Sequence, residues 1–408
     1  MKYEIETIND LCKKITDGSH FSPEHEDSGE YQMYSVKDME YNGFNNSNCK
    51  MIGKEMFMKL LKSDCRPLKN DILIAKDGSY LKYAFKVKED LNACILSSIA
   101  ILRPNEKKIN PDYFVYLMRS QSIKSAMANY VSGSALPRII LSDFKKMKLK
   151  IISDINLQQK IANILSRYDE AIENNNKRIK LLEKMAQNLY KEWFVRFRFP
   201  GYENCEFENG IPVGWKVERI GELYHTTSGG TPSRNHEEYY QEGTYPWIKT
   251  GELKDCPIID TEEYITEDAI KHSSAKVFEK DSLIIAMYGA TIGQLGINKM
   301  SATCNQACCV LRPKENRAFG IYYLFNFFKG NRDFIIGLSN GAAQQNLSQI
   351  LINKIKILNP PKEVLEPFEK MQSVFFQNIY FLQRANKNLA KQRDLLLPRL
   401  MSGKLEVK

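Results

Sequence analysis

Apolar side chains recur along two stretches of the chain at steps that alternate between four and three residues. The first stretch has Ile161, Leu165, Tyr168, Ile172, Asn175, Ile179, Leu182, Ala186, Leu189 and Trp193 at these positions. The second has Phe368, Gln372, Phe375, Ile379, Leu382, Asn386, Leu389, Arg393, Leu396 and Leu400. Such spacing places one seam of side chains along a long helix, as in a coiled coil. A constant offset of 207 residues relates the two stretches, which indicates an internal repeat.

The two predicted helices cover about residues 155–193 and 363–397, and Pro398 is expected to end the second one. A long helix with a single apolar seam needs a partner, and the simplest partner is the other helix, packed antiparallel. If the seam positions pair end to end, the residue numbers across each pair add up to 561.

This register places the seam asparagines Asn175 and Asn386 opposite each other near the middle of both helices. A matched polar pair in an apolar seam can fix the register of two helices. The alternative is that each asparagine is hydrated separately and fixes nothing. The ends of the seams are expected to meet as well, Ile161 with Leu400 and Trp193 with Phe368.

The segments that precede the two helices also match each other. Four pairs of short sequences follow in the same order in both halves, namely Glu6–Leu11 with Glu218–Leu223, Tyr34–Met39 with Ile248–Leu253, Asp71–Ala75 with Asp281–Ala286, and Ile101–Pro104 with Val310–Pro313. Short alternating apolar runs that end in turn residues predict strands. Helices are expected afterwards, over residues 113–130 in the first half and 320–337 in the second.

The pattern therefore predicts an α+β fold with two similar globular domains. Two long antiparallel coiled-coil helices separate these domains, and a pseudo-two-fold axis relates the halves. The expected segments are 1–152 for the first globular domain, 153–200 for a central helix, 201–360 for the second globular domain and 361–408 for a C-terminal helix.

The composition fits ordered globular domains, because 43% of the 408 residues are hydrophobic and 11% are aromatic. No run of 18 apolar residues occurs, and the start of the chain lacks the apolar core of a signal peptide. We therefore expect a cytoplasmic protein without a membrane segment. The nine cysteines include no CxxC pair, and no GxxxxGK[ST] phosphate loop occurs, so neither a zinc site nor an ATP-driven motor is expected.

The net charge of +9 suggests a polyanionic partner, but most of it lies on the predicted helices. Residues 155–200 and 361–408 each carry nine Lys or Arg against five Asp or Glu. The two globular domains together hold only about +1. A DNA-binding surface on these domains would need its basic residues to cluster apart from the acidic ones.

Two short motifs are similar to catalytic sequences, and neither makes a convincing enzyme. Residues 359–361 (NPP) resemble a loop of adenine methyltransferases, but Lys362 stands where that loop has an aromatic residue. Asp112 with Asp143 and Lys145 has the loose spacing of a metal-dependent nuclease, although Asp112 also suits the first turn of a helix. A single-chain nuclease and a purely structural coiled-coil adaptor are the alternatives to a DNA-binding function.

Several segments resemble the specificity subunit of type I restriction-modification systems. Residues 189–202 (LYKEWFVRFRFPGY) and 395–405 (LLLPRLMSGKL) are similar to the ends of that family's central and C-terminal spacer helices. The polar loop 341–348 (GAAQQNLS) resembles the loop that closes a target recognition domain. Pro360-Pro361 followed by Glu366 resembles the entry to a spacer helix. The resemblance covers essentially the whole chain.

This resemblance implies a subunit that does no chemistry. Its two target recognition domains would each read half of a bipartite DNA sequence, and its helices would set the gap and dock two methyltransferase (M) subunits. The M subunits would use S-adenosylmethionine, and restriction (R) subunits would use ATP and Mg. The implied partners are therefore double-stranded DNA and the M and R subunits. The chain itself would hold no cofactor or metal and contact no membrane.

Matching loops of the two halves supply the candidate DNA-binding residues. Arg, Lys, Asn and Gln read base edges, and Lys, Ser and Thr bind phosphates. The candidates in the first half are His20, Lys37, Lys76, Asp77, Ser79, Lys82, Ser134 and Arg138. Those in the second half are Lys249, Thr250, Tyr288, Thr291, Gln294, Gln344, Gln345 and Asn346.

Overall fold

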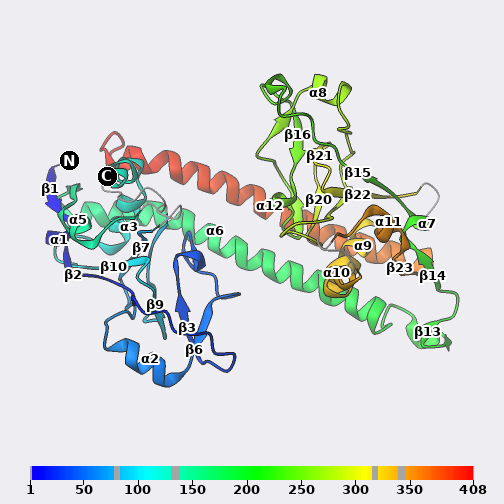
Figure 1. Cartoon of the computed structure of the whole chain (residues 1–408), viewed down its shortest axis with the longest axis horizontal. Helices are drawn as coiled ribbons and strands as arrows, with labels where there is room; N and C mark the ends of the chain where they lie inside the picture. Colours follow the sequence, from blue (N-terminus) through cyan, green and yellow to red (C-terminus); the bar gives the residue numbers. More distant parts are fainter. Residues whose placement is uncertain (1, 78–82, 130–137, 315–319, 339–345, 408) are drawn as a thin grey trace. The chain divides into compact units, whose positions relative to one another are not determined.

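The chain folds into two compact units (Figure 1). Unit 1 comprises residues 1–171 and 388–408, and unit 2 comprises residues 172–387. Both ends of the chain, blue and red in Figure 1, therefore belong to unit 1. This division cuts the long helices and differs from the four predicted segments, whose boundaries stay a prediction. The computed structural model describes residues 2–77, 83–129, 138–314, 320–338 and 346–407.

The two seams form the long helices of the structure. Helix α6 spans Ile155–Tyr190, and helix α12 spans Lys362–Met401. The predicted end of the second helix is wrong, because α12 runs through Pro398. This proline has no N–H to donate to the Asp394 carbonyl, so the helix loses one backbone hydrogen bond there. The burial of Leu397 and Leu400 on either side favours the helix.

Within each unit the two helices pair in the register that the seams predict. In unit 2, Asn175 Nδ2 donates to Asn386 Oδ1 at 2.8 Å, and the rings of Trp193 and Phe368 lie 5.7 Å apart. In unit 1, Ile161 and Leu400 are both fully buried in the same core cluster, as the predicted register requires. The asparagines thus meet, and their role in fixing the register stays a prediction.

Unit 1 is built around a four-stranded antiparallel sheet in the order β2-β10-β7-β8. Every residue of β7 is buried, so this strand is covered on both faces. A three-stranded sheet (β6-β3-β9) and the pairs β1-β11 and β4-β5 complete the strands. The elements are β1 (Tyr3–Thr7), α1 (Ile8–Leu11), β2 (Cys12–Asp17), β3 (Tyr31–Tyr34), η1 (Val36–Asp38), β4 (Met39–Glu40), β5 (Gly43–Phe44), β6 (Lys50–Ile52), α2 (Lys54–Leu61), β7 (Ile72–Ala75), β8 (Ala84–Lys86), β9 (Ala93–Ile95), β10 (Ile99–Pro104), α3 (Pro111–Arg119), α4 (Gln121–Ala128), α5 (Leu141–Lys146) and β11 (Lys148–Ile152).

Unit 2 repeats this design with a five-stranded sheet in the order β15-β22-β19-β20-β17. Its first four strands correspond to β2, β10, β7 and β8 of unit 1, which confirms the predicted α+β repeat. The elements are a π-helical turn η3 (Lys191–Val195), η4 (Tyr202–Asn204), β12 (Phe207–Glu208), β13 (Ile211–Pro212), β14 (Lys216–Arg219), α7 (Ile220–Leu223), β15 (Tyr224–Ser228), η5 (Glu237–Tyr239), β16 (Tyr245–Ile248), η6 (Thr250–Glu252), β17 (Cys256–Ile258), β18 (Tyr264–Ile265), α8 (Glu267–Lys271), β19 (Leu283–Ala286), β20 (Leu295–Asn298), β21 (Thr303–Cys304), β22 (Cys308–Pro313), α9 (Ile321–Gly330), α10 (Arg332–Gly337), α11 (Gln349–Lys354) and β23 (Lys356–Asn359). None of the described helices is long and apolar enough to cross a lipid bilayer.

The single helix predicted in each half is in fact two helices. In unit 1, α3 ends at Arg119 and α4 begins at Gln121, because Ser120 between them is extended (φ −64°, ψ 145°). The Ser120 hydroxyl donates to the carbonyl oxygen of Leu117 at 2.6 Å, and such side-chain bonds compete with helix continuation. In unit 2, α9 and α10 are divided at Asn331.

The Glu369 carboxyl group on α12 is buried against the start of α9 in unit 2. Its oxygens accept the backbone N–H groups of Tyr323 at 2.7 Å and Tyr322 at 3.3 Å. Glycine is required at position 320, because a Cβ atom there would overlap the Glu369 side chain. Burial raises the pKa of Glu369 to about 7, although the backbone N–H groups act to lower it.

We therefore expect unit 2 to lose stability as the pH rises from 4.5 to 7. The folded chain holds the Glu369 proton up to about pH 7, whereas the unfolded chain releases it near the usual pKa of 4.5. Release of this proton by the unfolded chain therefore lowers the free energy of unfolding by about 3 kcal/mol over this pH range. Tryptophan fluorescence in urea measures this change, since the chain's three tryptophans all lie in unit 2. Glu369→Gln should flatten the decline, and an unaltered decline in this variant would contradict the assignment.

Candidate nucleic-acid interface

The sheet of unit 1 brings charged side chains together where β2 and β7 end. Asp17 ends β2, and Lys76 and Asp77 follow β7 directly. The backbones of Arg138 and Asp77 form an isolated antiparallel β-bridge. The Arg138 Nε also lies 3.2 Å from Asp77 Oδ1. His20 Nε2 lies 3.4 Å from Asp17 Oδ1. We call these five residues the unit 1 corner, and four of them are among the residues predicted from sequence.

The members of this corner differ in how far they reach the surface. The Arg138 side chain is 46% exposed and that of His20 is 71% exposed, so both can touch a ligand. Lys76 is only 2% exposed, and its Nζ lies 3.3 Å from Asp17 and 3.7 Å from Asp77. We therefore assign Lys76 to holding the two carboxylates in place instead of contacting phosphate. Asp17 was not among the predicted residues, and its place at the end of a strand before Gly18 is the signal that could have found it.

Unit 2 builds the same corner from uncharged residues. Ser228 ends β15, and Met287 and Tyr288 follow β19. Tyr288 and Asn346 form an isolated antiparallel β-bridge, as Asp77 and Arg138 do in unit 1. The Ser228 hydroxyl donates to Gln349 Oε1 at 3.1 Å. These residues, Ser228, Met287, Tyr288, Asn346 and Gln349, are the unit 2 corner.

The backbone of the two corners is equivalent, although the side chains differ. The N–H of Ile139 donates to the Lys76 carbonyl at 2.9 Å, and the N–H of Leu347 donates to the Met287 carbonyl at 2.7 Å. Arg138 and Asn346 therefore occupy the same structural position. Arginine pairs best with guanine and asparagine with adenine in the major groove. The same scaffold can thus present two different base preferences.

The other predicted residues belong to neither corner. Lys37 is exposed on η1. Lys249 Nζ lies 2.9 Å from Glu263 and 3.0 Å from Glu262, and these hydrogen bonds raise the pKa of Lys249. Its charge is therefore already balanced within unit 2. Half-buried Thr250, Thr291 and Gln294 complete the predicted set in unit 2, and Ser79, Lys82, Ser134, Gln344 and Gln345 lie outside the described residues.

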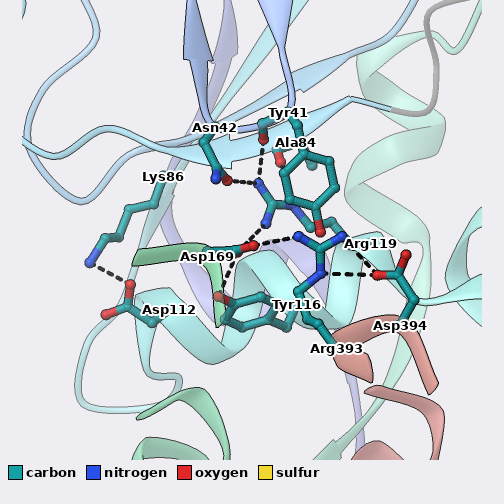
Figure 2. A network of polar contacts seen from close by, with 10 residues as sticks. All are labelled: Tyr41, Asn42, Ala84, Lys86, Asp112, Tyr116, Arg119, Asp169, Arg393 and Asp394. Atoms are coloured by element: carbon teal, nitrogen blue, oxygen red, sulfur yellow. Dashed lines mark hydrogen bonds and ion pairs between the residues drawn. The ribbon is translucent and has the colours of Figure 1, made fainter. Parts of the chain in front are cut away.

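A buried polar network joins the strands and helices of unit 1 (Figure 2). Asp169 on α6 is its centre and accepts from Tyr116 Oη at 2.8 Å and from Arg119 Nη1 at 3.1 Å. The Arg393 guanidinium on α12 binds the other oxygen of Asp169. Arg119 also reaches the β4–β5 hairpin, where Nη2 donates to Asn42 Oδ1 at 2.9 Å.

The ring of Tyr41 lies close to both guanidinium groups of this network (Figure 2). Its centroid is 3.9 Å from Arg119 Cζ and 4.2 Å from Arg393 Cζ. Cation–π contacts of this kind stabilise a desolvated cation. The hairpin is therefore fastened to both long helices, which fixes how the β strands of unit 1 sit on that part of the helix pair.

One face of the helix pair in unit 2 carries exposed apolar side chains. Phe376 packs on Phe325 with ring centroids 4.9 Å apart, so the side of α12 that carries Phe376 faces α9. Large apolar side chains stand exposed at the other flanking heptad positions, c and g, which lie together on one side of an antiparallel pair. They are Leu181, Met185, Met371, Val374 and Phe381, each at least 41% exposed. An apolar stripe of this kind marks a protein interface.

The residues of the nuclease alternative have ordinary structural roles. Asp112 lies in the first turn of α3 and pairs with Lys86 at 2.6 Å. Asp143 lies in the first turn of α5. Within the described parts of the chain, no three His, Cys, Asp or Glu residues lie close enough together to hold a metal ion. The nuclease alternative is therefore not supported.

Known proteins resemble this chain over most of its length. The family model for the type I restriction modification DNA specificity domain matches residues 1–184 and 212–388. The specificity subunit of the type I restriction enzyme MjaIX from Methanocaldococcus jannaschii is 29% identical over 304 residues, covering 72% of this chain and 69% of that protein. The HindI specificity subunit from Haemophilus influenzae is 25% identical over 407 residues, covering 83% and 87%.

A solved structure shares the fold. The S subunit of a type I restriction-modification system from M. genitalium matches with a TM-score of 0.61 and 18% sequence identity. The match covers 100% of this chain and 97% of that one.

Proposed function

Because this chain belongs to the type I restriction modification DNA specificity family, we propose that it selects the DNA sequence on which a larger methylating and cleaving complex acts. The chain is a specificity subunit and leaves the chemistry to partner subunits. The observation that carries the proposal is one surface corner built twice, with charged side chains in unit 1 and uncharged ones in unit 2. Reading two different half-sites requires a repeated scaffold of this kind with exchanged residues.

Each corner would read one half of a bipartite target. In unit 1, Arg138 would donate to guanine, with Asp77 orienting its guanidinium group. In unit 2, Asn346 would bind adenine, and the exposed ring of Tyr288 would contact the neighbouring base or sugar. Lys37 and His20 would serve the phosphates beside the unit 1 half-site.

The helix pair would dock the partner subunits. The exposed apolar stripe of unit 2 suits an obligate protein partner, since apolar surface is buried at such interfaces. We assign it to a methyltransferase subunit, and two such subunits with restriction subunits would complete the complex on double-stranded DNA. We expect this complex to act in the cytoplasm, where it would meet double-stranded DNA.

Methylation mapping tests the proposal in cells that express the chain with its methyltransferase. We expect methylated adenines in one motif, made of two half-sites separated by a gap of fixed length. Arg138→Ala should relax the base preference in one half-site and Asn346→Ala in the other. A lost bidentate contact is worth roughly 1–3 kcal/mol, so discrimination at the affected position should fall about 5- to 150-fold.

The exposed lysine Lys107 provides the matched control, because it lies in the turn after β10 in unit 1 and belongs to neither corner. Lys107→Ala should leave the motif unaltered. DNA binding without any sequence preference, with the methyltransferase present, would instead favour the structural adaptor. If both corner variants kept the full motif, the assignment of these residues to base reading would be wrong.

A further inference from the structure

Unit 1 contains an open hollow of about 980 Å³ that the proposed function does not use. It lies where the start of α4, strand β11 and the end of α12 meet. Four of its lining side chains are cationic and none is acidic. The cations are Lys148, Lys150, Arg399 and Lys404, and Leu117 and Ile123 belong to its apolar part.

These four cations lack the counter-charges that other cations of the chain possess. Among the described residues, Lys148, Arg399 and Lys404 take part in no ion pair, and Lys150 Nζ lies 4.3 Å above the ring of Tyr3. Lys76 and Lys249, by contrast, each contact two carboxylates. Like charges around one hollow repel each other, and an anionic occupant would relieve that repulsion.

The repeat shows what covers the equivalent place in unit 2. Position 150 corresponds to Leu358, position 401 to Phe194 and position 404 to Phe197. In unit 2 these residues share one core cluster with Phe199 and Trp215, which lie on the connection from η3 to β14. The ring of Phe197 lies 5.6 Å from Trp215 and 5.9 Å from Phe207, both on that connection.

This connection has a distinctive composition. Residues 199–215 (FPGYENCEFENGIPVGW) contain three glutamates and four aromatic residues but no lysine or arginine. Unit 2 thus covers this place with an acidic, aromatic segment. In unit 1 the corresponding place is the hollow, which is lined with cations and apolar groups.

We propose that the hollow of unit 1 binds an acidic, aromatic peptide segment of another polypeptide. The segment would take the place that residues 199–215 take in unit 2. Its carboxylates would pair with Lys148, Lys150, Arg399 and Lys404, and an aromatic ring would rest on the apolar part of the lining. Charged groups alone would suit nucleic acid as well, but the apolar lining and the example of unit 2 favour a peptide.

A synthetic peptide tests this proposal directly. The probe is the sequence of residues 199–215 with Cys205→Ser and a fluorescent label, and the full chain is titrated into it. We expect saturable binding by fluorescence anisotropy. Lys150→Glu and Arg399→Glu should each weaken binding at least tenfold. Lys146→Glu is the matched control, because Lys146 is exposed on α5 and does not line the hollow.

A second arm leaves the protein unaltered and changes the peptide. Replacing Glu203, Glu206 and Glu208 of the probe by Gln should also weaken binding at least tenfold. No saturation at about 1 mM chain, equal losses with Lys146→Glu, or displacement of the peptide by a short DNA duplex of unrelated sequence would each overturn the proposal. The test involves no target sequence, so its outcome is independent of the proposed function.

Discussion

Asp169→Ala is expected to lower the free energy of unfolding of unit 1 by about 3–5 kcal/mol. Asp169 is the shared partner of Arg119 and Arg393, whose side chains are only 5% and 7% exposed. Its loss removes the carboxylate that pairs with the buried Arg119 guanidinium group, and Arg393 then keeps Asp394 as its counter-charge. The hydroxyl of Tyr116 would also lose its acceptor, which adds the cost of an unsatisfied buried donor.

Hydrogen exchange at the amides of α3 and β7 measures this effect within unit 1. Tryptophan fluorescence should stay unaffected at the same time, since every tryptophan lies in unit 2. The adjacent exposed acid provides the control, and Glu170→Ala should alter stability by no more than about 0.5 kcal/mol. Equal exchange rates in the two variants would show that the network is not a buried ion cluster that stabilises unit 1.

Removal of one heptad from both long helices is expected to abolish methylation of the original target. Deleting residues 176–182 from α6 and 379–385 from α12 keeps the paired register and the Asn175–Asn386 contact, because these segments face each other in it. Each helix becomes shorter by about 10 Å. If the helices set the gap between half-sites, that gap should shrink by about three base pairs at roughly 3.4 Å each.

With the original gap, only one half-site could then be read at a time. Losing the contacts to several base pairs at roughly 1–3 kcal/mol each predicts that methylation of the original motif falls at least about 100-fold. A new motif with the same half-sites and the shorter gap should replace it in the methylation map. The length-preserving variant Lys180→Ala with Arg384→Ala, which alters exposed residues of the same segments, should keep the original gap. An unaltered gap after the deletion would refute the measuring role of the helices.

The failures of prediction share one cause. Pro398 stays helical because its buried neighbours outweigh its local preference, and residues 113–130 break at Ser120 through a side-chain bond to the backbone. Lys76, which was predicted to bind DNA, has a buried side chain that lies beside the carboxylates of Asp17 and Asp77. In each case a contact formed by the folded chain overrides the tendency of the residue alone.

The sequence by itself determined the features that repeat along the chain. Alternation of apolar and polar positions fixes which residues face a seam, so both helices, their pairing and the meeting of Asn175 with Asn386 follow from spacing. The duplication follows from the matching segments, and the fold class follows from the strand and helix periods.

Only the tertiary structure decided how side chains distant in sequence combine. Asp17, Asp77 and Arg138 meet because β2, β10 and β7 lie side by side in one sheet, and no local pattern encodes that contact. Arg393 interrupts the apolar seam, and its partner Asp169 can be identified only when α3, α6 and α12 pack together. Periodicity reports which face of an element is buried, whereas charge pairing and exposure depend on which elements the fold places against that face.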